Sequence, residues 1–447
     1  MSLNRRAFVG SLGATALAQA KDRPNIIWLT AEDLGPQLAC YGYPLVRTPN
    51  LDKMASEGVR FSRGFTTAPV CSPSRSAFNT GMYQTTIGAQ NHRSHRGDGY
   101  RLPEGVHLIT HYMRQQGYFT CNVKGLAPLI GAGKTDFNFK VEKPFDGDHW
   151  KNRAKGQAVF AHINFTATHK GPAMPAARKI GNPIRPEQVE LPPYWPDHPV
   201  IRDEFATYLN CVSLLDQQIG FVLNLLKKDG LLDNALVFFF GDNGRCLIRG
   251  KQWLYDAGIH VPLIAHWPGH VKAGEVREDP VSMIDMTATS VWASGATVPS
   301  NMQGHPLFGP LAKPREMIFA ARDRCDMTVD RIRCVRDRRY KFIRNFRPDL
   351  PYAQYNEYIN RQYPTQAVMK LLYSQDKLNE VQERWLAPTK PEIEFYDTQA
   401  DPHEVNNLAN VQQHKGLVDK FSRLLDNWIV ETDDKGRFPE PKSSVSA

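Results

Sequence analysis

The stretch "NALVFFFGDNG", residues 234–244, is an uninterrupted apolar run that leads into a glycine, an aspartate and an asparagine. A short run of this kind is typical of a strand buried on both faces, as in a parallel sheet that helices cover. The stretch "PNIIWLTAEDLG", residues 24–35, repeats the arrangement, because its apolar strand leads into two acids and a glycine. Together they predict an α/β fold with a large, mostly parallel sheet.

Helical patterns separate the predicted strands. A Thr-Pro-Asn start and a glycine stop bound the first helix, and glycines end the other two. The predicted helices are residues 48–58, 105–117 and 204–230, and a further buried strand is predicted at 158–165. This alternation predicts helices on both faces of the sheet.

The composition of the chain changes after residue 295. A connector rich in proline and glycine, residues 298–314, precedes "RIRCVRDRRYKFIRNF" at 331–346, where basic and apolar residues alternate. A period of two predicts antiparallel strands with one face toward solvent. We expect a main domain at 21–314 and a smaller C-terminal α+β domain, containing an antiparallel sheet, at 315–447.

The overall composition is that of an ordinary globular protein, with 41% hydrophobic and 23% charged residues and a net charge of +9. A basic balance suits nucleic acid, an anionic membrane surface or an acidic substrate. The sequence has no helix-turn-helix, zinc-finger or RNA-binding motif, and no uninterrupted apolar run approaches the ~18 residues that cross a bilayer. We therefore expect no nucleic-acid partner and no stable membrane anchor.

The first twenty residues predict an export signal. Arg5 and Arg6 precede a weakly apolar segment, and Ala18-Gln19-Ala20 forms a small-x-small cleavage site. The arginine pair is similar to a twin-arginine signal, which directs a folded protein across a bacterial membrane. We expect residues 1–20 to be removed and the protein to be exported, to the periplasm or outside the cell.

Acidic and amide side chains follow both of the apolar stretches. Glu32 and Asp33 follow one, and Asp242 and Asn243 follow the other. The carboxyl ends of parallel strands share one sheet edge, where ligands bind in open α/β sheets. Oxygen ligands of this kind suit Ca²⁺ or Mg²⁺ rather than zinc. Taken singly, Asp33 is also a good helix cap and "GDNG" a good tight turn.

Cys71 lies in "TTAPVCSPSRSAFNTGMY", residues 66–83, at the predicted start of a helix and four residues before Arg75. A helix N-terminus and a guanidinium both favour an anion, so a thiol there is expected to be reactive or a target of modification. The alternative is a small buried hydrophobic residue. Seven cysteines are too few for a disulfide framework, and no C-x-x-C pair indicates zinc.

Three further side chains are candidates for the same sheet edge. Lys134 in "GAGKTDF" and Lys251 in "RGKQWLYDAG" supply positive charge, and His169 in "TATHKGP" supplies an imidazole that titrates near neutrality. The alternatives are solvated surface lysines and a loop histidine that is satisfied by its neighbours.

In their order along the chain, these motifs resemble those of the type I sulfatases of the alkaline-phosphatase superfamily. The resemblance covers nearly the whole mature chain, and the stretches that carry it are "PNIIWLTAEDLG", "TPNLDKMASEGVRF", "CSPSR", "FTATHKGP", "FFFGDNG", "GKQWLYDAGIHVPLI" and "EFYDTQADPHEVNNLA". The C-x-P-S-R motif at Cys71 is the most specific of them. In this family, that motif directs oxidation of the cysteine to formylglycine.

The resemblance implies a role for each candidate residue. Cys71 becomes an aldehyde whose hydrate is the nucleophile, and Arg75 supports it. Lys134 and Lys251 bind the sulfate group, and His169 protonates the leaving group. A divalent cation, expected to be Ca²⁺ with Mg²⁺ as the alternative, is held by Glu32, Asp33, Asp242 and Asn243. A formylglycine-generating enzyme is the implied partner in maturation.

The sequence departs from the usual family pattern at two positions. The first carboxylate of the metal site is more often Asp, whereas Glu32 is one methylene longer. The lysine of the third motif is commonly followed two residues later by a histidine, but Lys134 is followed by Thr135 and Asp136. A histidine from "GAQNHRSHRGDG", His92 or His95, is therefore a candidate substrate-binding residue for the missing place.

The implied activity is hydrolysis of a sulfate ester, on a sulfated carbohydrate. Three alternatives stay open: a sulfamidase that cleaves the N-sulfate of glucosamine, a phosphate or phosphonate monoester hydrolase of the same superfamily, and a non-catalytic glycan-binding protein. The complete set of motifs argues against the last.

The basic strip at residues 322–347 is a candidate surface for a polymeric substrate. Its alternation with apolar residues predicts that Arg331, Arg333 and Arg336 share an exposed strand face, where an anionic polysaccharide could lie. A solvated strand face without a ligand is the alternative.

Overall fold

The computed structural model describes residues 23–171 and 173–440, so the expected export signal at 1–20 lies outside the described residues. The strands are β1 (Asn25–Ala31), β2 (Val59–Phe65), β3 (Phe119–Asn122), β4 (Lys124–Ala127), β5 (Ile130–Ala132), β6 (Val159–Phe165), β7 (Ala235–Gly241), β8 (His260–His266), β9 (Glu275–Arg277), β10 (Val281–Ser282), β11 (Ile318–Arg322), β12 (Ile332–Arg336), β13 (Tyr340–Asn345) and β14 (Ile393–Asp397). The α-helices are α2 (Pro49–Glu57), α3 (Cys71–Thr80), α4 (Ile109–Gln115), α5 (Ala173–Ala177), α6 (Pro199–Lys228), α7 (Asp256–Ile259), α8 (Met283–Ala293), α9 (Glu357–Gln362), α10 (Pro364–Tyr373), α11 (Glu380–Glu383) and α12 (Lys415–Glu431). Short 3₁₀ helices lie at Ala39–Tyr41, Trp150–Asn152, Pro186–Gln188, Gln412–His414 and Lys435–Arg437.

Ten of the described strands form a large sheet, in the order β10-β2-β8-β7-β1-β6-β5-β4, with β3 paired to β6 and β9 paired to β2. The centre of this sheet is parallel, because β1 pairs in parallel with both β6 and β7, and β3 pairs in parallel with β6. Antiparallel pairs join β8 to its two neighbours. The predicted α/β fold with a mostly parallel large sheet is confirmed.

The central strands are buried on both faces, as their continuous apolar sequences predict. In β1, Ile27 and Leu29 belong to the core on one face of the sheet, and Ile26 and Trp28 belong to the core on the other. Every residue of β7 is buried. Alternate side chains of a strand point to opposite faces, so only an apolar run without alternation can fill both cores.

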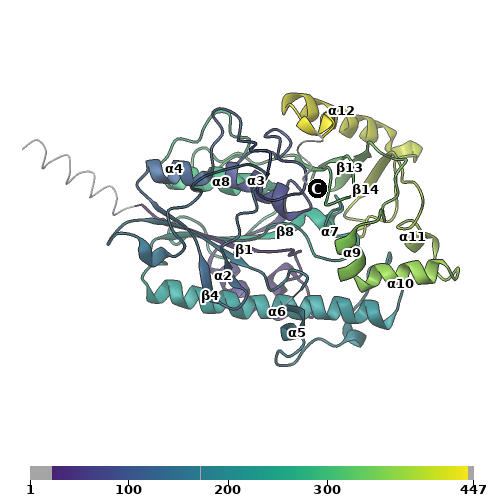
Figure 1. Ribbon diagram of the computed structural model, residues 1–447, viewed down its shortest axis with the longest axis horizontal. Coiled ribbons are helices and arrows are strands. Elements are labelled where there is room, and N and C mark those ends of the chain that lie inside the picture. Colours follow the sequence, from purple (N-terminus) through teal and green to yellow (C-terminus); the bar gives the residue numbers. More distant parts are fainter. Residues whose placement is uncertain (1–22, 172, 441–447) are drawn as a thin grey trace, which may run out of the picture.

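Helices cover both faces of the large sheet (Figure 1). Helices α2 and α6 lie on one face, and α3, α4 and α8 lie on the other. The first two predicted helices are found as α2 and α4. The longest one begins earlier than predicted, at Pro199, because the ring of His198 accepts a hydrogen bond from the backbone of Val200 and proline suits the first helical position.

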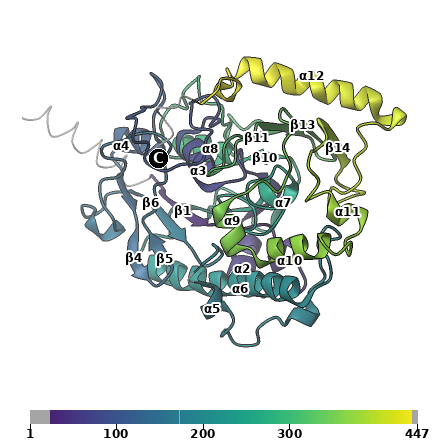
Figure 2. The same cartoon turned by 45° about the vertical axis from the view of Figure 1, so that its right-hand side comes forward.

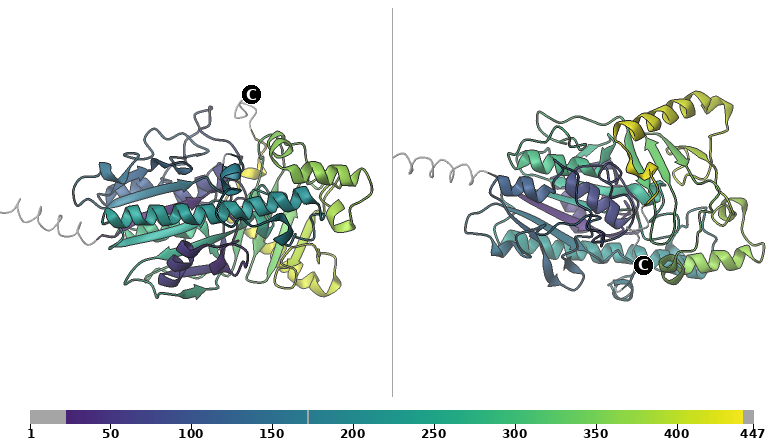
Figure 3. Two further views of the ribbon diagram at one scale, coloured as in Figure 1. Left: turned by 90° about the horizontal axis from the view of Figure 1, so that it is seen from below. Right: turned by 45° about the horizontal axis from the view of Figure 1, so that its top comes forward.

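Helix α6 is long and apolar enough, by length and composition, to cross a membrane. It lies across one face of the large sheet (Figure 3). Many of its apolar side chains, among them Leu209, Leu215 and Ile219, are fully buried in the core beneath β1 and β7, whereas Phe221 is 43% exposed. This burial is what the core helix of a globular protein shows.

A second, four-stranded sheet has the order β11-β12-β13-β14, and all of its pairs are antiparallel. One face packs Val335 and Phe342 against Phe421 and Trp428 of α12. The opposite face, which includes Ile332, joins the same core as α6. The predicted antiparallel sheet in the C-terminal part of the chain is therefore confirmed.

The prediction that this sheet has one face toward solvent is wrong. Strand β12 is buried along its whole length, and Arg333 and Arg336 are at most 3% exposed. Arg333 lies 2.6 Å from Asp434 and 3.0 Å from Asp323. The basic residues of this strand can be buried because acidic side chains from other segments pair with them. The exposed polysaccharide-binding face expected at 322–347 is thus absent at Arg333 and Arg336.

This burial predicts a large loss of stability when Arg333 is replaced. The Arg333→Ala variant leaves Asp323 and Asp434 buried without their partner, which costs ~3–5 kcal/mol of unfolding free energy. The Arg338→Ala variant is the control, because Arg338 pairs with Asp279 on the surface, with 55% of its side chain exposed. Urea unfolding followed by circular dichroism measures both. Equal losses in the two variants would contradict the assignment of Arg333 to the core.

Candidate active site

Two acidic clusters meet at the carboxyl end of the central strands. Strands β1 and β7 are in parallel register up to the pair Ala31 and Gly241, so the residues that follow them leave the sheet side by side. The backbone N–H of Asp242 donates to the carbonyl of Ala31 at 3.0 Å. The N–H of Glu32 donates to the carbonyl of Phe165, the last residue of β6, also at 3.0 Å.

Direct hydrogen bonds link the two clusters. Asp33 has a left-handed backbone, with φ of 53°, and its N–H donates to Asp242 Oδ1 at 3.0 Å. The amide of Asn243 donates to Asp33 Oδ1 at 2.9 Å. Asp tolerates this left-handed conformation better than most residues do. The structure therefore links three of the four residues proposed to hold a cation by hydrogen bonds, and the fourth, Glu32, lies 3.8 Å from Arg75, which pairs with Asp242.

Cys71 lies at the start of α3, as the sequence predicts. The helix begins at Cys71, after an extended Val70, and ends before Gly81, whose φ is 71°. Pro73 is accommodated because its position is within the first turn. The thiol is buried, and its Sγ atom lies 3.8 Å from Asp33 Oδ1.

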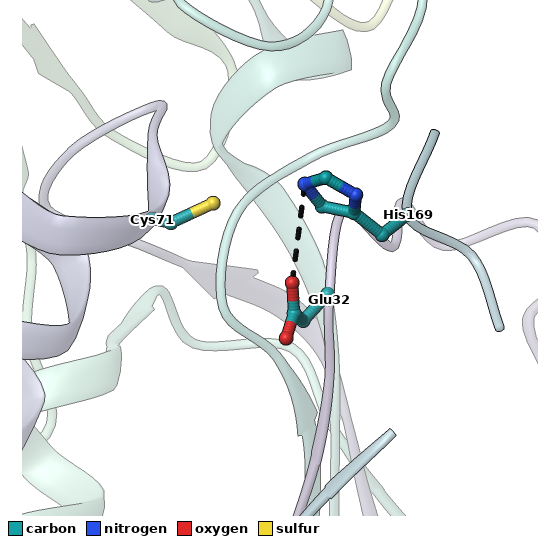
Figure 4. Close-up of side chains that lie close together, drawn as sticks. All are labelled: Glu32, Cys71 and His169. Atoms are coloured by element: carbon teal, nitrogen blue, oxygen red, sulfur yellow. Dashed lines mark ion pairs between the residues drawn. The ribbon is translucent and has the colours of Figure 1, made fainter. Parts of the chain in front are cut away.

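The thiol, a carboxylate and an imidazole converge beside this helix. Ligand atoms of Glu32, Cys71 and His169 all lie within 4.8 Å of one another. Figure 4 shows the three side chains pointing toward a common space, from the residue that follows β1, from α3 and from the loop after β6. This cluster combines three of the sequence-predicted residues.

Arg75 lies one turn after Cys71 and is fully buried. Its Nε donates to Asp242 Oδ2 at 3.0 Å, and its Nη1 donates to Asn164 Oδ1 at 2.6 Å. Burial alone would lower the pKa of the guanidinium, but Asp242 and Glu32 raise it. Arg75 therefore stays charged and holds the carboxylate of Asp242 in one orientation.

The two candidate lysines lie in different segments of the chain, and each one contacts an acid of the cluster. Lys134 Nζ donates to Glu32 Oε2 at 3.0 Å, and it lies 3.4 Å from Asp136 Oδ2. Lys251 Nζ donates to Asp33 Oδ2 at 2.9 Å and is 6% exposed as a residue. A solvated surface lysine is therefore excluded for Lys251, and both ammonium groups carry their charge into the cluster.

His169 is held in one tautomer. Its Nδ1 lies 2.8 Å from the carbonyl oxygen of Lys170, which can only accept, so Nδ1 carries a proton. Its Nε2 faces the cluster, at 3.4 Å from Lys251 Nζ, 3.7 Å from Asp33 Oδ2 and 4.0 Å from Glu32 Oε2. Nε2 is therefore the ring atom available for proton transfer.

The thiol of Cys71 is a weak nucleophile in this environment. Burial raises its pKa to about 12, and Lys134 and Lys251 offset only part of that effect. The carboxylates of Asp242 and Asp33 act in the same direction as burial. Burial, more than the nearby acids, therefore disfavours the thiolate, and of the two expectations for Cys71 the raised pKa argues against a reactive thiol and leaves modification open.

The carboxylates themselves respond to the cations around them. Burial would raise the pKa of Asp33, but Lys251 and His169 hold it at about 2. Burial would likewise raise the pKa of Glu32, but Lys134 and Arg75 hold it below its ordinary value. In Asp242 burial prevails, so its pKa is raised despite Arg75.

The chemistry of this network fits a divalent cation. Its donors are carboxylate and amide oxygens, the set that Ca²⁺ and Mg²⁺ prefer. Two of them, Glu32 Oε1 and Asn243 Oδ1, are buried and accept no hydrogen bond from any described residue. A buried acceptor without a donor is costly unless a cation or water satisfies it. Glu32, in the position where the family more often has Asp, takes part in this arrangement.

The two histidines proposed for the missing place follow α3 in the chain and bind different partners. His92 Nδ1 lies 2.8 Å from Asp326 Oδ1, an acid from the C-terminal part of the chain. His95 Nε2 lies 3.2 Å from the hydroxyl of Thr135, which directly follows Lys134. Both imidazoles thus lie near segments that carry candidate residues.

Sequence reasoning missed two residues of this region. Asn164, which fixes Arg75, is one of two polar residues, with His162, in the mostly apolar β6, and that contrast was a usable signal. Tyr358 of α9 has its ring centroid 5.6 Å from Lys251 Nζ and 6.4 Å from the ring of His169. Tyr358 lies more than a hundred residues along the chain from Lys251, in a segment with no motif, so no local pattern pointed to it.

Family models match most of the chain. A model described as Sulfatase matches residues 24–158 and 146–296. A second, described as N-sulphoglucosamine sulphohydrolase, C-terminal, matches residues 247–388. The first match includes the whole cluster built from β1, α3, β6 and β7.

Individual relatives of this chain carry names that agree with the two family models. An ulvan-active sulfatase of Formosa agariphila is 33% identical, over 94% of this chain and 77% of the relative. The human N-sulphoglucosamine sulphohydrolase is 25% identical, over 94% of this chain and 92% of the relative.

Solved structures share the fold. One, in complex with its substrate D-glucosamine-2-N,6-O-disulfate, has a TM-score of 0.62 at 18% identity, over 92% of this chain and 98% of the other. The phosphonate monoester hydrolase of Agrobacterium radiobacter has a TM-score of 0.66 at 17% identity, over 92% of this chain and 96% of the other. With the family model matched over more than half of the chain, the protein belongs to the type I sulfatases of the alkaline-phosphatase superfamily and is a sulfuric ester hydrolase.

Proposed function

We propose that this protein hydrolyses a sulfate ester of a carbohydrate, with a formylglycine hydrate derived from Cys71 as its nucleophile. One observation carries the proposal: the cysteine of the C-x-P-S-R motif, Glu32 and His169 have ligand atoms within 4.8 Å of one another. An unmodified thiol with a pKa near 12 is a poor nucleophile at neutral pH, whereas a hydrated aldehyde supplies two hydroxyl groups at the same position.

The two hydroxyl groups divide the reaction into two steps. One attacks the sulfur, the bond from sulfur to the sugar oxygen breaks, and a covalent sulfate forms on residue 71. The second hydroxyl then loses its proton, the carbon–oxygen bond to sulfate breaks, and the aldehyde and free sulfate result. A serine could perform the first step but has no second hydroxyl for the other.

Two cationic residues are suited to the charge of the sulfate group. Lys134 and Lys251 would bind its oxygens, and their ammonium groups are already fixed by Glu32 and Asp33. Fixed cations stabilise the charge that develops in the transition state without having to reorganise. Arg75 would act indirectly, because it holds the carboxylate of Asp242.

His169 is the proposed proton donor to the sugar oxygen. Its Nδ1–H donates to the carbonyl of Lys170, which leaves Nε2 to carry the second proton toward the cluster. Nε2 lies 3.7 Å from Asp33 Oδ2 and 4.0 Å from Glu32 Oε2. A general acid must be within hydrogen-bond reach of the leaving oxygen, and Nε2 is the ring atom turned to that space.

The residues that would hold the divalent cation are Glu32, Asp33, Asp242 and Asn243. When bound, a cation of this kind lowers the pKa of the attacking hydroxyl and neutralises negative charge on the sulfate oxygens. Three carboxylates and an amide of irregular geometry suit Ca²⁺ better than Mg²⁺, which demands a near-ideal octahedron.

Relatives support a carbohydrate as the substrate class. They are named for activity on ulvan, on N-acetylgalactosamine 6-sulfate and on N-sulphoglucosamine. A sulfamidase is the second candidate, because the model that matches residues 247–388 is that of N-sulphoglucosamine sulphohydrolase. A phosphonate monoester hydrolase is less favoured, since that likeness extends to the fold alone.

Maturation and export complete the proposal. Residues 1–20 would direct the folded protein out of the cell through a twin-arginine route. Cys71 is buried in the folded chain, so the formylglycine-generating enzyme would have to act on it before folding, and hence before export. The main domain at 21–314 would then contain every proposed reacting residue, and the C-terminal domain at 315–447 would complete the substrate pocket.

A substrate panel tests the activity. The panel contains ulvan oligosaccharides, N-acetylgalactosamine 6-sulfate, N-sulfoglucosamine, an aryl sulfate and a phenyl phosphonate ester. We expect kcat/KM for a carbohydrate sulfate to exceed that for the phosphonate roughly 100-fold, because the cations and pocket are matched to the sulfate monoester. Release of sulfate from N-sulfoglucosamine alone would favour the sulfamidase. Faster cleavage of the phosphonate than of every sulfate would contradict the proposal.

Elemental analysis tests the cation site. The purified protein should contain about one Ca²⁺ per chain, in keeping with its oxygen-only donor set. The Asp33→Asn variant should lose the ion, because it removes a carboxylate from the network. The matched control is Asp216→Asn, which changes a buried carboxylate that binds Asn50 and Leu51 far from the cluster. Stoichiometric zinc without calcium, or equal calcium in both variants, would refute this assignment.

A further inference from the structure

Tyr358 brings a side chain from the C-terminal part of the chain to the proposed active site. It belongs to α9, which lies against the carboxyl end of the large sheet (Figure 2). Its ring centroid is 5.6 Å from Lys251 Nζ and 6.4 Å from the ring of His169. It also stacks edge-on against Tyr363, at 5.7 Å between centroids. The ring therefore lies beside two of the candidate catalytic residues, Lys251 and His169.

The hydroxyl of Tyr358 has no partner among the described residues, although the atom is buried. Buried tyrosine hydroxyls usually find a hydrogen-bond partner, because an unsatisfied one costs free energy. Burial raises the pKa of Tyr358, and Lys251 offsets only part of this, so the group is a neutral donor at physiological pH. A donor kept free in this position is suited to a ligand.

The position of α9 is fixed by a network that reaches the active site. Asn356 caps the helix, since its Oδ1 accepts from the N–H of Ile359 at 3.0 Å. Its Nδ2 donates to Asp326 Oδ2 at 3.2 Å. Asp326 also accepts from Gln252, the residue after Lys251, and pairs with His92. The segment that carries Tyr358 is thus tied to the residue next to the sulfate-binding lysine.

We propose that Tyr358 is a substrate-binding residue that determines specificity for a sugar over other sulfate esters. Its hydroxyl donates a hydrogen bond to a hydroxyl group of the sugar next to the sulfated carbon, and its ring packs against the apolar face of the same sugar. The inference rests on the proposed function, because it places the sugar beyond the sulfate group that Lys251 binds.

The chemistry of a pyranose matches what Tyr358 offers. A sugar ring presents C–H groups on its faces and hydroxyl groups at its edge, and a tyrosine presents an apolar ring with a polar tip. An aryl sulfate offers a flat face but no neighbouring hydroxyl. A site built to bind a hydroxyl group discriminates strongly against an analogue that lacks it. The loss of the tyrosine hydroxyl should therefore reduce selectivity for the saccharide rather than activity in general.

Matched variants test this role. Tyr358→Phe removes only the hydroxyl, and Tyr355→Phe is the control, because Tyr355 precedes α9 and is 68% exposed. The measured quantity is the ratio of kcat/KM for the panel saccharide that the wild type hydrolyses fastest to kcat/KM for the aryl sulfate. We expect Tyr358→Phe to lower this ratio about tenfold, mainly through KM, as the loss of one buried hydrogen bond predicts. Tyr355→Phe should leave it unchanged.

A binding measurement separates this inference from the proposed function. In a Cys71→Ala background, calorimetry should show the three panel saccharides binding about tenfold more weakly when Tyr358 is Phe. If the wild type hydrolyses no sulfate ester, the proposed function fails, and the calorimetry still decides the role of Tyr358. An unchanged ratio and unchanged affinity, or an equal fall for saccharide and aryl sulfate, would overturn the assignment. Thermal unfolding confirms that each variant is folded.

Discussion

Three buried carboxylates face three cations at the carboxyl end of β1 and β7, and the rest of the site depends on this balance. Asp242 is paired with Arg75, Glu32 with Lys134, and Asp33 with Lys251. A buried charge without its partner costs several kcal/mol, of order 3–5, so each side chain has one stable position. The parallel register of the two strands sets the spacing of the acids, and the start of α3 then sets the distance from them to residue 71.

The second sheet stabilises the segment that carries Lys251. Helix α7 follows that lysine, and its Asp256 lies 2.6 Å from Arg336 of β12 and 2.5 Å from Lys341 of β13. Lys341 is also 2.7 Å from Glu404 and donates to the carbonyl of Leu254 at 3.0 Å. The basic residues that the sequence suggests as a ligand surface therefore join the C-terminal sheet to the active-site segment.

The sequence predicted those features that depend on residues close together in the chain. The apolar runs of β1 and β7 could be read because a strand buried on both faces has no polar alternation, and Cys71 was correctly placed at the start of a helix. The environment of Arg333 could not be predicted, since its partner Asp434 is 101 residues away in the chain. The same limit applies to Tyr358. Such contacts arise only when segments far apart in the chain pack together.

Residue 71 is the chemical centre of the proposed mechanism: burial raises the pKa of the thiol to about 12, and we propose that its oxidation product supplies the two hydroxyl groups. Peptide mass spectrometry of the purified, active protein tests this most directly. The peptide that contains residue 71 should have the mass of the aldehyde, and the aldehyde fraction should rise in proportion to sulfatase activity across preparations. Full activity from a preparation in which Cys71 remains a thiol would contradict the account.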